Sequence, residues 1–231
     1  MNWRSAPLIL SLLTFGFFSA NAGVITGTVT AQGKQIAEQP GAAGNYESRK
    51  FKFVDRINYA EMRDFIVYIE GPITNSVVAP GTTRKVLTQK DAAFRPHVLP
   101  ICVGTTVEWP NQDEVFHNVF SYSEAKSFDL GLYKSDLKKP DPKVPFDKSG
   151  RVDVFCSIHS NMHCVILVLE NTFFTTTDSA GHYTLRDVPT GTYKLKAWHE
   201  RLPPQVKEIT VSETGETKAD FTLGIKDLPR Y

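Results

Sequence analysis

Apolar and polar residues alternate in short runs along this chain. At residues 23–30, 151–156 and 206–211, apolar side chains recur at about every second position, which is the period of a strand with one buried face. Residues 65–70 predict a further strand. The continuous apolar run at 165–169 predicts a strand that is more fully buried. No long stretch carries a helical period, so the sequence predicts an all-β fold, most simply two β-sandwiches.

Breaks between these runs predict the loops. Residues 31–63 are polar and glycine-rich, which predicts a long loop with a short helix near residues 59–62. Gly71-Pro72 ends the second strand. Pro96 and Pro100 suit an edge strand, because proline cannot donate a ladder hydrogen bond.

The first 22 residues have the pattern of a signal peptide. Arg4 precedes an apolar run, and Ala20-Asn21-Ala22 has the small-x-small form of a cleavage site. The run is shorter than the roughly 20 residues of a membrane span. We therefore expect residues 1–22 to be removed and the mature protein to be exported to the periplasm without membrane insertion.

Charge gives no reason to propose a nucleic-acid or membrane partner. The chain has 26 Lys and Arg against 25 Asp and Glu, and Arg4 is the one charged residue of the signal peptide. The mature chain is thus formally neutral, whereas nucleic acids and anionic membranes select a basic excess.

Three cysteines, an odd number, invite an explanation in an oxidising compartment. Metal binding by Cys156 would account for one. Cys102 and Cys164 could then form a disulfide or stay free, and the sequence leaves both options open because it does not give their separation.

Cys156-x-x-His159-x-x-Met162 lies between two predicted strands. A short loop at one end of a sandwich would direct these three side chains toward one point. His117 follows an earlier turn at residues 111–113 that can reach the same end. A thiolate, two imidazoles and a thioether suit copper that changes oxidation state. The pattern therefore predicts one type 1 (blue) copper ion.

Other interpretations of these residues remain open. Cys156 could be a small buried side chain with ordinary loop histidines nearby. Cys156, His159, His163 and Cys164 also have a spacing that suits zinc. Haem attachment is excluded, because no Cys-x-x-Cys-His sequence occurs.

Four histidines, at positions 97, 163, 182 and 199, lie outside this predicted set. We expect His97 on the surface or in a hydrogen bond, and His182 in a structural turn. His163 should point away from the copper, with an auxiliary copper contact as the alternative.

The residues around the predicted ligands resemble the cupredoxins. The resemblance rests on Val107-Glu108-Trp109-Pro110-Asn111, on His117-Asn118-Val119 and on Phe155-Cys156-x-x-His159-x-x-Met162, a loop similar to that of the amicyanins. It covers residues 84–170 and implies a Greek-key β-sandwich.

The same resemblance implies a role for each site residue. His117, Cys156 and His159 would be the equatorial copper ligands, and Met162 the axial one. Asn118 would brace the cysteine loop and donate a hydrogen bond near the sulfur, which tunes the reduction potential.

The last part of the chain, residues 171–225, resembles the carboxypeptidase regulatory-like, prealbumin-type β-sandwich, which is grouped with carbohydrate-binding-like folds. Its residues are turn formers such as Asp178, Gly181 and Gly191 between alternating runs, and they suggest a compact meander. Trp198 is expected to cap this core, with docking to the copper unit or a redox partner as the alternative.

Residues 23–83 could belong to either sandwich. Their two predicted strands also resemble the opening strands of the regulatory-like module. If they belong there, the cupredoxin unit is inserted into that module, and residues 24–30 should pair with its strands.

The combination resembles exported bacterial proteins labelled methylamine-utilisation or plastocyanin-like, although nothing in the chain identifies methylamine as a substrate. It implies a periplasmic, non-enzymatic carrier of single electrons between redox proteins that the sequence does not name. The alternatives are copper binding for tolerance, without electron transfer, and glycan or protein docking by the C-terminal module. An oxidase or nitrite reductase is disfavoured, because extra His-x-His motifs are missing.

Overall fold

The computed structural model describes residues 22–33, 58–73, 83–136, 138–213 and 215–224. This part of the chain is built of strands, with one 3-10 turn, η2 (Tyr59–Glu61), where a short helix was expected. The all-β class is therefore confirmed. Residues 1–21 of the predicted signal peptide and most of the polar loop lie outside the described residues, whereas Ala22 is the first residue of β1 (Ala22–Ala31). In the described part, no helix has the length and apolar character needed to cross a membrane.

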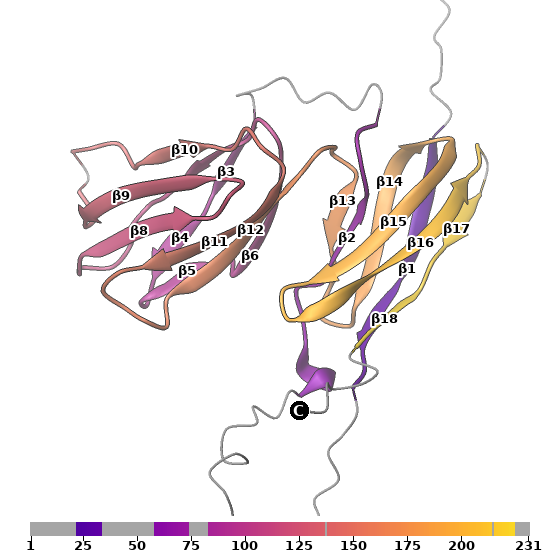
Figure 1. The fold of residues 1–231 in the computed structure, drawn as a ribbon, viewed down its shortest axis with the longest axis horizontal. Helices are drawn as coiled ribbons and strands as arrows, with labels where there is room; N and C mark the ends of the chain where they lie inside the picture. Colours follow the sequence, from indigo (N-terminus) through magenta and orange to yellow (C-terminus); the bar gives the residue numbers. More distant parts are fainter. Residues whose placement is uncertain (1–21, 34–57, 74–82, 137, 214, 225–231) are drawn as a thin grey trace, which may run out of the picture.

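One unit of the fold is a sandwich formed by the middle of the chain, which we call the inserted sandwich (residues 84–169; Figure 1). Its larger sheet has the order β6 (Val98–Cys102), β12 (His163–Leu169), β11 (Gly150–Cys156), β8 (His117–Tyr122) and β9 (Ser127–Tyr133). The other sheet has the order β10 (Lys143–Pro145), β7 (Thr106–Glu108) and β3 (Arg84–Val86), and β4 (Thr88–Lys90) pairs with β5 (Ala93–Arg95). β6, which carries Pro100, is an edge strand as expected.

The second unit, the outer sandwich, joins strands from both ends of the described chain (Figure 1). One sheet has the order β14 (His182–Pro189), β1 (Ala22–Ala31) and β17 (Glu216–Lys218), with β18 (Phe221–Leu223) also paired to β1. The other has the order β13 (Phe174–Thr176), β2 (Ile66–Ile69), β15 (Gly191–His199) and β16 (Leu202–Val211).

Strand pairing shows that one sandwich is inserted into the other. β1 pairs with β14, β17 and β18, and β2 pairs with β13 and β15. Both N-terminal strands thus belong to the outer sandwich. The chain leaves it after β2, forms the inserted sandwich, and returns at β13, so the insertion hypothesis is confirmed.

The meander expected in the C-terminal part is wrong. β13 and β15 pair with β2, whereas β14 pairs with β1 in the opposite sheet. Among the described strands from β13 to β18, only β15 and β16 form a hairpin of consecutive strands. The turn residues were placed correctly: Gly181 has φ 85° and its amide donates to the Asp178 carbonyl at 3.0 Å. A turn motif marks a change of direction but does not say which sheet receives the next strand.

β12 is buried on both faces because it lies between the two units. Cys164, Ile166 and Val168 face the core of the inserted sandwich, where Trp109 and Phe146 are fully buried. The alternate residues Val165, Leu167 and Leu169 form a second cluster with Ile66 and Trp198 of the outer sandwich. We call this contact the seam. It explains why the run at 165–169 has no polar positions.

Trp198 lies in the seam and not in the core of its own module. It is 9% exposed and packs with β12 residues, and the Arg151 guanidinium lies 5.9 Å from its ring centroid. The expectation that it caps the module's core is therefore wrong, and docking to the other sandwich is what the structure shows. A ring covered in this way is not an exposed platform for a glycan.

Cys102 and Cys164 are free and buried. Cys102 on β6 pairs with Leu169 on the parallel strand β12. Leu169 lies five residues along β12 from Cys164. At about 3.3 Å per residue this separates them by about 16 Å, far more than a disulfide spans. Burial raises the pKa of both thiols, which keeps them protonated and unreactive.

Candidate metal centre

Two antiparallel strands bring the predicted ligands to one end of the inserted sandwich. Cys156 is the last residue of β11, and His117 is the first of β8. In the β11–β8 ladder Cys156 lies opposite Val119, two residues from His117. Both side chains are buried. The alternation that buries Val119 also turns His117 to the same inner face.

Backbone hydrogen bonds hold the loop between β11 and β12 closed. The Met162 amide donates to the His159 carbonyl at 2.9 Å, and the Cys156 amide donates to the Met162 carbonyl at 3.2 Å. Phe155 and His163 are paired across the two strands just outside the loop. The loop between β11 and β12 is thus short and fixed at both ends. The Cys156-x-x-His159-x-x-Met162 spacing predicted such a short loop.

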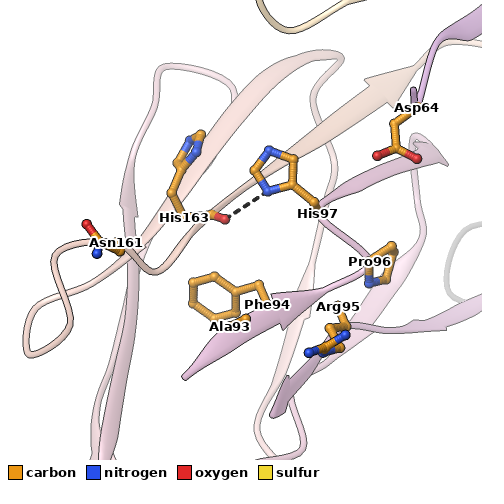
Figure 2. Close-up of a pocket in the computed structure, with 8 residues that line it drawn as sticks. All are labelled: Asp64, Ala93, Phe94, Arg95, Pro96, His97, Asn161 and His163. Carbon is orange, nitrogen blue, oxygen red and sulfur yellow. Dashed lines mark hydrogen bonds between the residues drawn. The ribbon is translucent and has the colours of Figure 1, made fainter. Parts of the chain in front are cut away.

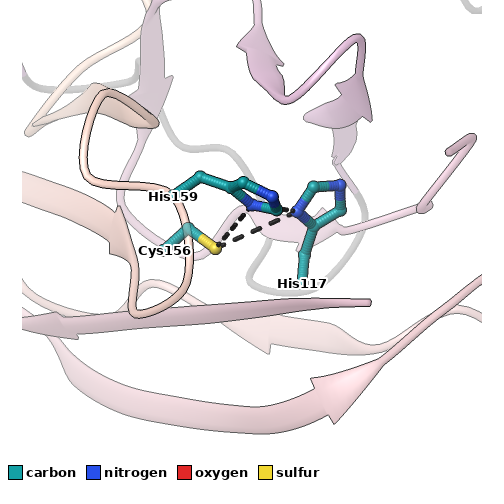
Figure 3. Close-up of side chains that lie close together, drawn as sticks. All are labelled: His117, Cys156 and His159. Atoms are coloured by element: carbon teal, nitrogen blue, oxygen red, sulfur yellow. Dashed lines mark hydrogen bonds between the residues drawn. The ribbon is translucent and has the colours of Figure 1, made fainter. Parts of the chain in front are cut away.

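Three donor atoms converge on one point (Figure 3). His117 Nδ1 lies 3.1 Å from His159 Nδ1, and Cys156 Sγ lies 3.9 Å from the first and 3.7 Å from the second. Donors about 2.0–2.3 Å from a shared ion, at trigonal to tetrahedral angles, lie about 3.3–3.8 Å apart. Shifts of about 0.2 Å would fit these atoms around one ion. The donor set therefore fits a transition-metal ion.

Met162 is 1% exposed and packs in the same core cluster as Cys156. Its backbone is fixed by the two hydrogen bonds that close the loop. The residue is therefore placed beside the cysteine, while its role as an axial ligand stays a prediction.

Asp113 orients the His117 ring. Its Oδ2 lies 2.8 Å from His117 Nε2, so Nδ1 is the nitrogen that faces Cys156 and His159. The pKa of the Asp113 carboxyl is lowered. Burial alone would raise it, but hydrogen bonds from the Ala92 amide, from His117 and from the Asp91 amide outweigh burial. An ionised carboxylate therefore faces Nε2, which is how metal-binding imidazoles are commonly held.

Asn111 holds the turn that carries Asp113. Its side-chain amide donates to the carbonyls of Val115 and Tyr133 at 3.0 and 3.2 Å, and its Oδ1 accepts the Asp113 amide at 2.9 Å. Burial raises the pKa of Tyr133, whose hydroxyl donates to the Trp109 carbonyl at 2.9 Å. Sequence reasoning placed this turn but missed the roles of Asn111 and Asp113. The signal that could have indicated Asp113 is its position four residues before His117.

Asn118 is buried, but it follows His117 on β8, where successive side chains point to opposite faces. Its Nδ2 donates to Asp129 on β9. This amide nitrogen thus bonds to Asp129 and not near the Cys156 sulfur, where a hydrogen bond was predicted. The bracing role of Asn118 stays a prediction.

The residues of the zinc alternative do not form one cluster. In the described part of the chain, Cys156 and His159 group with His117, whereas His163 groups with His97 and Glu200. Cys164 lies on β12 opposite Val154, in the core. His163 points away from the predicted copper ligands, as expected, because it is the first residue of a strand in which neighbours alternate.

Comparison with known proteins bears on both sandwiches. Residues 165–224 match the family model described as a carboxypeptidase regulatory-like domain. The match covers β13 to β18 and most of β12, whereas β1 and β2, which complete the same sandwich, lie outside it. No curated protein matches this chain.

Solved structures with similarity to this chain include copper proteins. A copper-containing nitrite reductase (NirK) from Thermus scotoductus SA-01 is 25% identical, with 44% of this chain and 26% of that chain covered and a TM-score of 0.36. A reduced amicyanin variant is 22% identical, covering 44% of this chain and 97% of that one, with a TM-score of 0.33. A purple cupredoxin from Nitrosopumilus maritimus is 25% identical, covering 44% and 96%, with a TM-score of 0.29.

The part of the chain that resembles a regulatory-like module is thus matched by a family model of that description. The match spans only about a quarter of the nitrite reductase chain.

Proposed function

We propose that this protein is a type 1 copper protein that carries single electrons between larger redox proteins. The observation that supports this most directly is the convergence of His117 Nδ1, His159 Nδ1 and Cys156 Sγ in the inserted sandwich. Copper held by such a donor set supplies one-electron redox chemistry. Met162 would complete the set as a weak axial ligand.

The protein's own contribution is rigidity. His117 is held by Asp113, Cys156 by a strand end, and His159 by a loop that two backbone hydrogen bonds close. Ligands fixed in this way move little when the charge of the ion changes. A site of this kind suits electron transfer and not substrate conversion, so we propose a non-enzymatic role.

Electrons would enter and leave by His159. Its side chain is partly exposed, whereas His117 and Cys156 are buried. Large apolar side chains next to these ligands in the chain are exposed: Ile158 by 50%, Val115 by 50% and Phe116 by 51%. Exposed apolar side chains near the ligands would suit a redox partner.

A spectrum of the copper-loaded protein tests the proposal. The copper(II) form is expected to show an intense thiolate-to-copper charge-transfer band, which Cys156→Ser abolishes. Cys102→Ser, which replaces a cysteine outside the site, should leave the band intact. A colourless copper(II) adduct of the wild-type protein would refute the type 1 assignment.

Copper binding for tolerance, without electron transfer, is the second candidate. It is favoured by a second group of side chains that could hold a metal ion, His97, His163 and Glu200. Measurement of the reduction potential and of the electron self-exchange rate separates the two candidates. Slow exchange and a potential outside the range of periplasmic donors would support tolerance.

We also propose that the protein acts in the periplasm, from the signal-peptide pattern of residues 1–22. Its redox partners are unidentified, and neither nucleic acid nor membrane insertion is part of the proposal. The outer sandwich would hold the inserted sandwich in position and could itself bind a protein. Fractionation of cells that express the full chain tests the location.

A further inference from the structure

A second group of side chains that could hold a metal ion lies at the seam, apart from the site of Cys156. His97 directly precedes β6, His163 begins β12, and Glu200 lies in the turn between β15 and β16. One ligand atom from each residue lies within 4.8 Å of the others. The group thus draws two imidazoles from the inserted sandwich and one carboxylate from the outer sandwich.

The His97 ring is fixed through both of its nitrogens. Nδ1 lies 3.1 Å from the backbone carbonyl of His163, to which it donates (Figure 2). Nε2 lies 2.9 and 3.0 Å from the two Glu200 oxygens. Metal-binding histidines are commonly held in this way, with one ring N–H on a carbonyl and the other nitrogen directed at the ion.

His163 is fixed by different neighbours. Its Nε2 lies 3.1 Å from Asp153 Oδ1, and its ring stacks on Phe155 with 4.8 Å between centroids. Asp153 is held in turn by two hydrogen bonds from Arg151, at 2.9 and 2.7 Å. The His97 and His163 rings meet edge-on, 5.7 Å apart between centroids. The two imidazoles are therefore preorganised before any ion arrives.

The surroundings of the cluster favour a cation. Glu200 and Asp153 contribute negative charge, and Asp64 lines the same hollow as His97 and His163. Two cations lie near this group, and each has an acidic partner: Arg151 pairs with Asp153, and Arg95, which lines the same hollow, pairs with Asp91. Glu200 and Asp64 thus remain as carboxylates that neither arginine side chain pairs with.

The cluster also opens to solvent. A hollow of about 610 Å³ is lined by Asp64, Phe94, His97, Asn161 and His163, among others (Figure 2). An ion can reach the imidazoles through this hollow and keep water molecules on the positions that the protein does not fill.

We propose that His97, His163 and Glu200 bind a second ion, a divalent transition metal, at the seam between the two sandwiches. Two imidazoles and a carboxylate suit Zn²⁺ or Cu²⁺. Without a thiolate ligand, this ion gives no intense charge-transfer band, so it is distinguishable from the ion at Cys156. It ties Glu200 of the outer sandwich to the inserted one. Its ligand His163 follows Met162 in the chain, which places the second ion close to the first site.

Calorimetric titration of the metal-free full-length protein with Zn²⁺ tests this at about pH 7.5, where free imidazoles are neutral. The wild-type protein is expected to bind two ions and His97→Ala one. Glu200→Gln keeps the size of the side chain and should weaken the second ion by at least about tenfold. His182→Ala is the matched control: it removes an exposed histidine paired with Asp178 in the outer sandwich, and should still bind two.

Imidazole nitrogen resonances give a second measurement that does not depend on counting ions. Zn²⁺ should shift the Nε2 signal of His97 in the wild-type protein and leave that of His182 in place. A wild-type protein that binds one ion, a His97→Ala protein that still binds two, or an unshifted His97 signal would each overturn the proposal. The His97–Glu200 contact would then be an ion pair that joins the sandwiches. None of these outcomes depends on the colour of the copper form.

Discussion

His117 Nε2 lies 2.8 Å from Asp113 Oδ2, and this contact fixes which nitrogen of the ring can bind a metal. The other nitrogen, Nδ1, then faces Cys156 Sγ and His159 Nδ1. Asp113 is thus a positioning residue four places from the ligand it orients. It belongs to the turn before β8, so the turn and the strand end form one unit of the site.

We expect Asp113→Ala to weaken copper binding by about 10–100-fold, the usual effect of losing the group that orients a metal-binding histidine. Competition with a coloured copper chelator measures this. Glu114→Gln, which alters the exposed neighbouring carboxylate, is the control and should bind copper as the wild type does. Unchanged affinity in Asp113→Ala would show that His117 is held by its strand alone.

The sequence was sufficient to predict His117, Cys156 and His159 as a group, because the order of residue types and the short loop between two strands constrain the geometry strongly. It was not sufficient for Asp113, because an acidic residue in a turn is common and its partner depends on the ring orientation. It also did not name Asp129 as the partner of Asn118. The neighbour of a ligand on a strand faces the other way, and here its amide nitrogen bonds to Asp129.

Removal of copper should lower the stability of the protein. A ligand that binds only the folded state, present at about a thousandfold over its dissociation constant, adds about 4 kcal/mol to the free energy of unfolding. Urea unfolding with and without copper measures the difference. Cys156→Ser should lose most of this increment, whereas Cys102→Ser should keep it. An increment of the same size in Cys156→Ser would place the stabilising ion elsewhere.

Trp198→Ala should weaken the coupling of the two sandwiches. The ring packs against β12 at the seam, and truncation of a buried tryptophan costs about 3–5 kcal/mol. Because the loss falls on the contact between units, we expect calorimetry to show two separate unfolding transitions in the variant. Val206→Ala, at an exposed position on β16, should change stability by less than about 0.5 kcal/mol. A single transition at a lower temperature would mean that the sandwiches are coupled by other contacts.

The seam also explains a limit of the sequence prediction. The apolar run at 165–169 indicated a strand covered on both faces, but nothing local said what covers the second face. Ile66, far away in the chain, and Trp198, beyond the end of β12, provide that cover. Sheet membership of β13, β14 and β15 was missed for the same reason, because the partners β1 and β2 are supplied by the other end of the chain.

A contact in the outer sandwich should make stability depend on pH. Lys196 Nζ on β15 donates to Glu70 at 2.8 Å, and this hydrogen bond is the main reason that the pKa of Glu70 lies below its usual value near 4.5. A carboxyl with a lowered pKa in the folded state adds stability above its unfolded pKa, and this stability is lost as pH falls through the folded pKa.

Because the Glu70 side chain is 40% exposed, solvent screening limits this contribution to less than about 1 kcal/mol. Glu70→Gln should therefore be less stable than the wild type at neutral pH, and the difference should shrink as pH falls below about 4.5. Denaturant unfolding across that range measures it. Glu208→Gln, at an exposed position on β16, is the control. A deficit in Glu70→Gln that stays constant with pH would trace the effect to packing and not to the charge of Glu70.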